Sequence, residues 1–192
     1  MTAKPDTWVV RVAREDDPVL LTEPARGNAR PTGVRAARRV VPGMDRGSRA
    51  LRIAVPGFGP EPSCSTIRFP VNDAVALWAD KVAEATTLIV KARAGTPRSK
   101  RVEIVLIEED GAPWGTSDIA LDTQWREIRI PFDKLRFFAH WKPACASRGK
   151  KGDRLRPAKV ARISVCFGAF LYPETREQPH AIEIQEISLL SE

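Results

Sequence analysis

Few side chains of this chain are suited to covalent chemistry. It has only two histidines and three cysteines among 192 residues, and they show no CxxC or paired-histidine spacing of a metal site. A base and nucleophile pair of His140 and Cys145 is conceivable, but no motif surrounds either residue. Cys166 lies in an apolar run and is expected to be a small buried hydrophobe. We therefore expect no catalytic residue in this chain, and an enzyme is the last function considered.

The segment Gly95–Lys100 has a superficial likeness to a phosphate-binding loop. It lacks the second glycine and the Lys-Ser or Lys-Thr ending of that motif, and it falls between two expected strands rather than before a helix. We discount it as a nucleotide site.

The aromatic residues favour binding over reaction. An indole can stack on the apolar face of a pyranose ring, while nearby polar side chains bind the sugar hydroxyls. Trp114 follows a turn and Trp141 lies in a basic segment, so both are candidates for such a surface. A structural role stays open for each, and Trp114 can equally plug one end of the fold. Trp8, Trp78 and Trp125 occur in periodic contexts that favour the core.

Charged side chains alternate with apolar ones along several segments. They are Arg68, Lys91, Arg93, Glu103, Glu127 and Arg129. If neighbouring strands bring them to one sheet face, its arginines can bind carboxylate or sulfate groups bidentately, which favours an acidic polysaccharide as ligand. The expected binding residues are Trp114, Trp141, Arg93, Arg129 and His140. The alternative is a solvated face whose charges form cross-strand ion pairs.

The charge balance is consistent with an anionic partner but does not require one. Lys and Arg number 31 against 24 Asp and Glu, a net charge of +7. The densest basic clusters, Arg26–Arg39 and Arg148–Arg162, lack the interleaved aromatics of a single-stranded nucleic-acid platform, so no nucleic-acid partner is expected. No apolar run approaches the roughly 18 residues of a membrane span, and no signal peptide is visible at the start. The compartment is undecided by these residues.

An all-β rhythm runs through most of the chain, since apolar and polar residues alternate between Gly, Pro and Asp turns. The expected strands are 8–12, 49–55, 65–69, 87–94, 102–108, 125–130, 161–167 and 182–189. Asp110-Gly111 signals a tight turn, and helical spacing is confined to Asp73–Ala85. These features predict an all-β fold, a β-sandwich jelly roll of two antiparallel sheets with at most one or two short helical turns. Residues 1–192 would form one domain with long loops at 23–39 and 138–157.

These segments resemble the carbohydrate-binding-module-like, galactose-binding jelly-roll domains appended to bacterial glycoside hydrolases and polysaccharide lyases. The matching pieces are Ser48–Ile53, Leu88–Ala94, Glu109-Asp110-Gly111 with Trp114, Trp125–Phe132 and Ile182–Leu189. The resemblance implies a non-catalytic carbohydrate-binding or accessory domain within a larger protein. Its partners would be a polysaccharide and a parent catalytic domain, and an extracellular or periplasmic location is favoured.

The same resemblance implies a structural calcium ion held by acidic groups near the two chain ends. The family often carries an Asp-Asn pair in the last strand, where this chain has Gln185 and Glu186. Oxygen ligands for calcium would then come from Asp16, Asp17 and Glu183. Otherwise these are solvated acidic residues and no cofactor is bound.

The run Trp125–Phe132 also looks like the jelly-roll domain of intracellular assembly factors related to complex I biogenesis. A structural or assembly role without a sugar ligand therefore stays open, because a fold does not fix a function.

Overall fold

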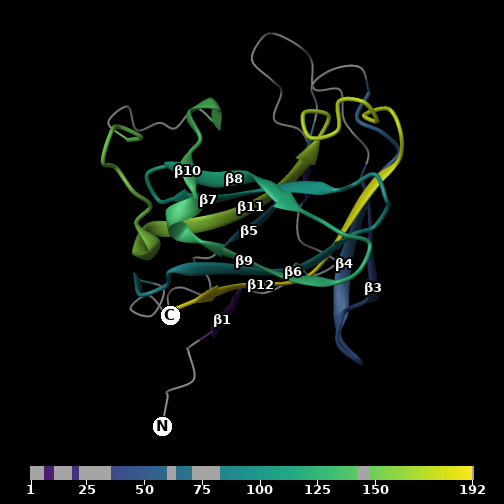
Figure 1. Cartoon of the computed structure of the whole chain (residues 1–192), viewed down its shortest axis with the longest axis horizontal. Coiled ribbons are helices and arrows are strands. Elements are labelled where there is room, and N and C mark those ends of the chain that lie inside the picture. The colour runs from purple at the N-terminus through teal and green to yellow at the C-terminus, as the bar shows by residue number, and fades with distance from the viewer. Residues whose placement is uncertain are drawn as a thin grey trace.

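Two antiparallel six-stranded sheets pack face to face in the computed structural model (Figure 1). The structure describes residues 36–59, 83–141 and 148–191, and only the backbone of 7–10, 19–21 and 64–70. Sheet A has the order β3 (Ala37–Pro42), β4 (Arg49–Val55), β12 (His180–Leu190), β6 (Thr87–Ala94) and β9 (Arg126–Pro131), with β1 (Thr7–Val10) paired to β12. Sheet B has the order β10 (Arg136–Phe137), β8 (Pro113–Ala120), β7 (Arg101–Glu108), β11 (Val160–Gly168), β5 (Cys64–Pro70) and β2 (Val19–Leu21). The predicted β-sandwich jelly roll is thus confirmed.

Helical structure is almost absent from the described residues. Apart from Ala83, they contain only the 3₁₀ turns η1 (Phe132–Lys134), η2 (Ala139–Trp141) and η3 (Pro157–Lys159). Most of the helical turn expected at 73–85 lies outside the described residues. No described helix is long and apolar enough to cross a membrane.

Alternation along the strands builds the core between the sheets. On β6, Leu88 and Val90 are buried against sheet B, whereas Lys91 and Arg93 point outward, as the period of two requires. β7 is different because its outward positions are also covered: Val105 is buried as completely as Ile104. Covered on both sides, β7 reads as a nearly continuous apolar run.

The predicted turn at Asp110-Gly111 joins β7 to β8. Gly111 has a φ of 85°, a left-handed conformation that favours glycine, and its N–H donates to the Glu108 carbonyl at 2.9 Å. The Asp110 carboxylate accepts the Ala112 N–H at 3.0 Å. The turn is therefore fixed by both glycine freedom and an aspartate side chain.

The sequence pattern did not predict four of the strands, β2, β3, β8 and β10. β8 contains Gly115, Ser117 and Asp118, which have weak strand propensity, and only its pairing with β7 and β10 makes it a strand. β3 begins at Ala37, inside the segment 23–39 that was expected to be a loop. That expectation is wrong for its last three residues, because pairing with β4 orders an arginine-rich edge.

The basic segment after η2 is fastened to sheet B by ion pairs. Arg148 binds the Glu108 carboxylate through both terminal nitrogens and reaches Asp153 through Nε at 2.8 Å. Arg156 Nε donates to the same glutamate at 2.6 Å, and its guanidinium also contacts Asp110. Much of the positive charge expected on the surface of this segment is therefore neutralised in place.

Candidate functional site

The outer face of sheet B carries a buried carboxylate. Val102, Ile104 and Leu106 of β7 point into the core, so Glu103 between them points to the side away from sheet A. Its side chain is nevertheless only 3% exposed. A charged group in this position needs polar partners, since burying an unpaired carboxylate is costly.

An aromatic segment covers this part of the sheet. β10 pairs with β8, and the chain then turns back over the outer face, with the Phe138 N–H donating to the Pro113 carbonyl at 2.9 Å. Gly115 permits this approach, because a Cβ there would lie 2.9 Å from the Phe138 ring. In Figure 1 the chain after β10 stands on the side of sheet B away from sheet A.

Trp141, at the end of this segment, completes the surroundings of Glu103. The indole N–H of Trp141 and the Ser117 hydroxyl both donate to the carboxylate, the latter at 2.8 Å. Burial raises the pKa of Glu103, and the two hydrogen bonds oppose that shift by stabilising the ionised form. The cluster thus holds a half-buried indole in place through a carboxylate that lies beneath it.

His140 adds an exposed ring beside this cluster. Its centroid lies 4.9 Å from that of the half-buried Phe138, at an interplanar angle of 37°. Partial burial lowers the pKa of His140, which favours the neutral ring at neutral pH. Phe138, His140 and Trp141 together form the surface that we call the η2 surface, with Glu103 and Ser117 beneath it.

The arginines expected to bind beside Trp141 lie on the opposite side of the sandwich. Arg93 is on the outer face of sheet A, where its Nε donates to Glu183 at 2.6 Å and its guanidinium lies 4.8 Å from the Trp125 ring centroid. Arg52 binds the other oxygen of Glu183 at 2.5 Å. Trp125, expected in the core, is therefore a partly exposed residue stacked under an arginine.

Arg129 shares this outer face of sheet A and pairs with Glu127 at 3.0 Å. Lys91 likewise pairs with Glu186 at 3.2 Å. These are the cross-strand and near-neighbour ion pairs that the sequence left open as an alternative. The five expected binding residues are thus not brought together: His140 and Trp141 share one face, and Arg93 and Arg129 share the other.

Trp114 belongs to neither face. It is 5% exposed, packs in the core edge-on to Phe137 at 5.5 Å between ring centroids, and lies under the Arg148 guanidinium at 5.8 Å. Its indole N–H has no hydrogen-bond partner among the described residues. A stacking platform for a sugar does not fit this burial, whereas the plug at one end of the sandwich does.

The expected calcium ligands are not assembled in the described structure. Asp16 and Asp17 lie outside the described residues. The Glu183 carboxylate is 3% exposed and both its oxygens are bound by arginines, so a calcium role does not fit it. Among the residues that the structure describes, no group of three His, Cys, Asp or Glu side chains is placed to hold a metal ion.

Sequence reasoning missed Ser117 and Phe138, and it grouped Glu103 with the charged residues of a sheet face rather than with buried ones. One signal was present: Glu103 interrupts the apolar run Val102–Ile107. A lone charge in such a run indicates either a solvated face or a buried polar partner, and only the tertiary structure distinguishes them. The predicted burial of Cys166 is confirmed.

Comparison with known proteins gives a likeness of fold. No family model matches the sequence, and no curated protein does. The family 11 carbohydrate-binding module of the cellulosomal cellulase Lic26A-Cel5E of Clostridium thermocellum is 13% identical, with a TM-score of 0.61 over 100% of this chain and 97% of that chain. The family 30 module of the cellulosomal cellulase Cel9D-Cel44B of the same organism is 12% identical, with a TM-score of 0.56 over 97% of this chain and 98% of that one.

A further family 11 structure from Clostridium thermocellum contains a β-1,3-1,4-mixed-linked tetrasaccharide. It is 16% identical, with a TM-score of 0.53 over 83% of this chain and 84% of that chain. At these identities the likeness shows the fold alone. The chain is therefore an all-β sandwich structurally similar to family 11 and family 30 carbohydrate-binding modules of cellulosomal enzymes.

Proposed function

We propose that this chain is a non-catalytic carbohydrate-binding domain of a polysaccharide-degrading enzyme, and that the η2 surface binds the glycan. One observation carries the proposal: the half-buried Trp141 and the buried Glu103 are hydrogen-bonded on an outer sheet face. Such an arrangement offers a pyranose an aromatic ring whose orientation is fixed by a buried acceptor. The domain would act by holding a linked catalytic domain near its substrate.

The burial of Glu103 supports a binding role because it weakens the fold. A glutamine of the same size would accept hydrogen bonds from Ser117 and Trp141 without the desolvation of a charge. A group that destabilises its own site is expected where a ligand uses it, although structural networks also contain such groups.

The alternative of a purely structural or assembly domain is less well supported. It would be favoured by a contiguous exposed apolar patch. Of the described residues, Met44 and Phe170 are the large hydrophobics that are exposed, and they lie in different loops. This is the pattern of scattered surface residues rather than of a docking face.

Affinity gel electrophoresis of the chain tests the proposal. Neutral mixed-linked β-glucan is the first ligand to try, because a family 11 module was solved with such an oligosaccharide. Cellulose-type, agarose-type and uronic-acid polysaccharides follow. Retardation by at least one glycan supports the proposal, and migration unchanged by all of them would contradict it.

An acidic glycan is a narrower form of the same proposal, based on the charge of +7 rather than on the comparisons. Arg93 and Arg129 were expected to hold the anionic groups, but carboxylates already pair with both. The positive charge for an acidic chain must then come from another part of the surface.

A further inference from the structure

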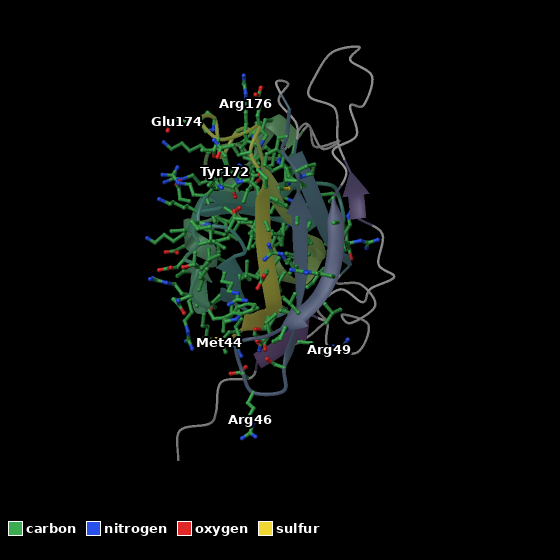
Figure 2. The ribbon with its side chains drawn as sticks, turned by 90° about the vertical axis from the view of Figure 1, so that its right-hand side faces the viewer. Met44, Arg46, Arg49, Tyr172, Glu174 and Arg176 are labelled. Carbon is green, nitrogen blue, oxygen red and sulfur yellow. The ribbon has the colours of Figure 1, made fainter. Side chains whose placement is uncertain are left out.

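A pocket at one end of the sandwich gathers three cationic side chains. It has a volume of about 590 Å³ and lies between the β6–β7 connection and the loop after β11. Its lining includes Arg98, Lys100 and Arg101 from the first segment, and Tyr172 and Glu174 from the second. Figure 2 shows Glu174 and Arg176 at the end of the molecule opposite Met44 and Arg46.

The three cations differ from the arginines that are already paired with carboxylates. Arg98, Lys100 and Arg101 are exposed, and none has a side-chain ion pair or hydrogen bond among the described residues. By contrast, Arg52, Arg93, Arg148 and Arg156 are each bound to a carboxylate. Glu174 is the acidic residue among those that line the pocket, so the pocket has an excess of positive charge.

The segment that carries these cations is held rigidly. Ser99, between Arg98 and Lys100, is fully buried, and its hydroxyl accepts the Ala181 N–H at 2.9 Å. The same hydroxyl lies 3.3 Å from His180 Nδ1, and the Tyr172 hydroxyl donates to the Arg101 carbonyl. Because this backbone is already ordered, only the side chains of the cations lose conformational freedom when they bind an anion.

We propose that this cationic pocket binds an oxyanion, the sulfate or carboxylate group of an acidic polysaccharide. The chemistry is charge-assisted hydrogen bonding from two guanidinium groups and an ammonium group. The segment Gly95–Lys100, discounted as a nucleotide loop, thus acquires a different role through its side chains. The glycan as source of the anion rests on the proposed function, whereas the pocket itself can be tested with a simple anion.

The first experiment titrates the whole chain with sodium sulfate at constant ionic strength and follows backbone amides by NMR. Saturable shifts are expected in residues 95–101 and 171–175. They should vanish in the triple variant Arg98→Gln, Lys100→Gln, Arg101→Gln. They should persist in the matched control Lys134→Gln, Lys150→Gln, Lys151→Gln, which removes the same charge from exposed side chains elsewhere. If the sulfate-induced shifts were lost equally in both variants, or occurred only in residues outside the pocket, the proposed anion site would be overturned.

The second experiment compares sulfated, carboxylated and neutral polysaccharides in affinity gels. The wild-type chain should bind the charged glycan about tenfold more tightly than the neutral one, and the pocket variant should lose this preference while keeping its neutral binding. Binding without any charge preference overturns the inference and leaves the proposed function intact. Sulfate shifts without binding to any glycan overturn the proposed function and the glycan source, and support a site for small oxyanions.

Discussion

The Arg148 guanidinium and the Glu108 carboxylate meet as a two-pronged pair, with Nη1 to Oε2 at 2.8 Å and Nη2 to Oε1 at 2.9 Å. The glutamate side chain is fully buried and the arginine is 9% exposed. The hydrogen bonds to Asp153 and Glu108 raise the pKa of Arg148, so the guanidinium stays charged at any practical pH. The pair joins the last residue of β7 to a segment 40 positions away in sequence.

Glu108→Gln should destabilise the fold by about 3 kcal/mol, because it removes the carboxylate that binds both terminal nitrogens of the nearly buried Arg148 guanidinium. Urea unfolding at neutral pH measures the loss. Glu109→Gln is the matched control: Glu109 is exposed and pairs with Lys159 at 3.3 Å, so its loss should cost less than about 1 kcal/mol. Equal effects of the two substitutions would show that the pair with Arg148 does not stabilise the segment.

Glu103→Gln should separate stability from binding. The folded state raises the pKa of Glu103 above its usual value of 4.5, so the folded protein holds the proton more tightly than the unfolded chain. Its ionised form therefore weakens folding above the raised pKa, and this penalty disappears as the pH falls through the raised pKa toward 4.5. The free energy of unfolding of the glutamine variant, minus that of the wild type, should be positive at pH 7 and should shrink toward pH 4. A pH-independent difference would contradict this assignment.

The same variant should bind glycan more weakly, because glutamine is a weaker acceptor than a carboxylate for the Trp141 indole N–H and holds the stacking ring less firmly. Affinity gels on the glycan retained by the wild type measure this. A variant that is both more stable and fully active in binding would show that Glu103 has no part in the site.

Trp141→Ala should reduce glycan affinity by about tenfold or more, since it removes the stacking ring and an indole donor. Trp141→Phe keeps an aromatic face and should retain more of the affinity. Trp125→Ala removes a partly exposed indole from the opposite face and is the control. If only Trp125→Ala weakened binding, the glycan site would lie on sheet A.

Arg129→Ala and Arg93→Ala test the binding role that the sequence suggested for these arginines. Because both side chains are paired with carboxylates on the outer face of sheet A, glycan affinity should change less than about twofold in each variant. Arg93→Ala should reduce stability more than Arg129→Ala, since it removes one of two cations on the buried Glu183. Isothermal titration and urea unfolding of the same samples separate the two effects.

His180 should make the fold sensitive to mild acid. The ring is fully buried, with Nε2 2.9 Å from the Thr175 carbonyl and the Tyr172 ring stacked at 4.2 Å. Burial chiefly lowers the pKa of His180, and the charge of Arg98 contributes. The neutral ring is thus favoured in the folded state, and its contribution to stability, complete above about pH 6.5, is lost as the pH falls toward the lowered pKa.

The free energy of unfolding should therefore decrease as the pH is lowered from 7.5 to 5. The imidazole NMR signals of His180 should titrate with a pKa below that of an ordinary histidine. His140→Gln is the control and should retain the decline, because His140 is exposed. Titration of His180 at or above about 6.5 would contradict this assignment.

Local sequence determined the strands whose side chains alternate. β4 and β6 match the predicted ranges 49–55 and 87–94, and the glycine turn after β7 lies where it was expected. These elements depend on a period of two and on the φ freedom of glycine, both of which are written in neighbouring residues. The two-layer fold follows from these strands, because a sheet whose strands are apolar on one face must pack that face against another layer.

Only the tertiary structure decided which side chains share a surface. Trp114 and Trp141 were both candidates for the binding surface, yet pairing of β8 with β7 turns the first into the core, and β10 carries the second over the outer face. Arg93 and Glu103 both alternate with apolar neighbours, but they belong to different sheets and point in opposite directions. The physical reason is that a strand fixes only the alternation of its own side chains. The sheet it joins, and the segment that covers that sheet, are set by contacts between residues far apart in the chain.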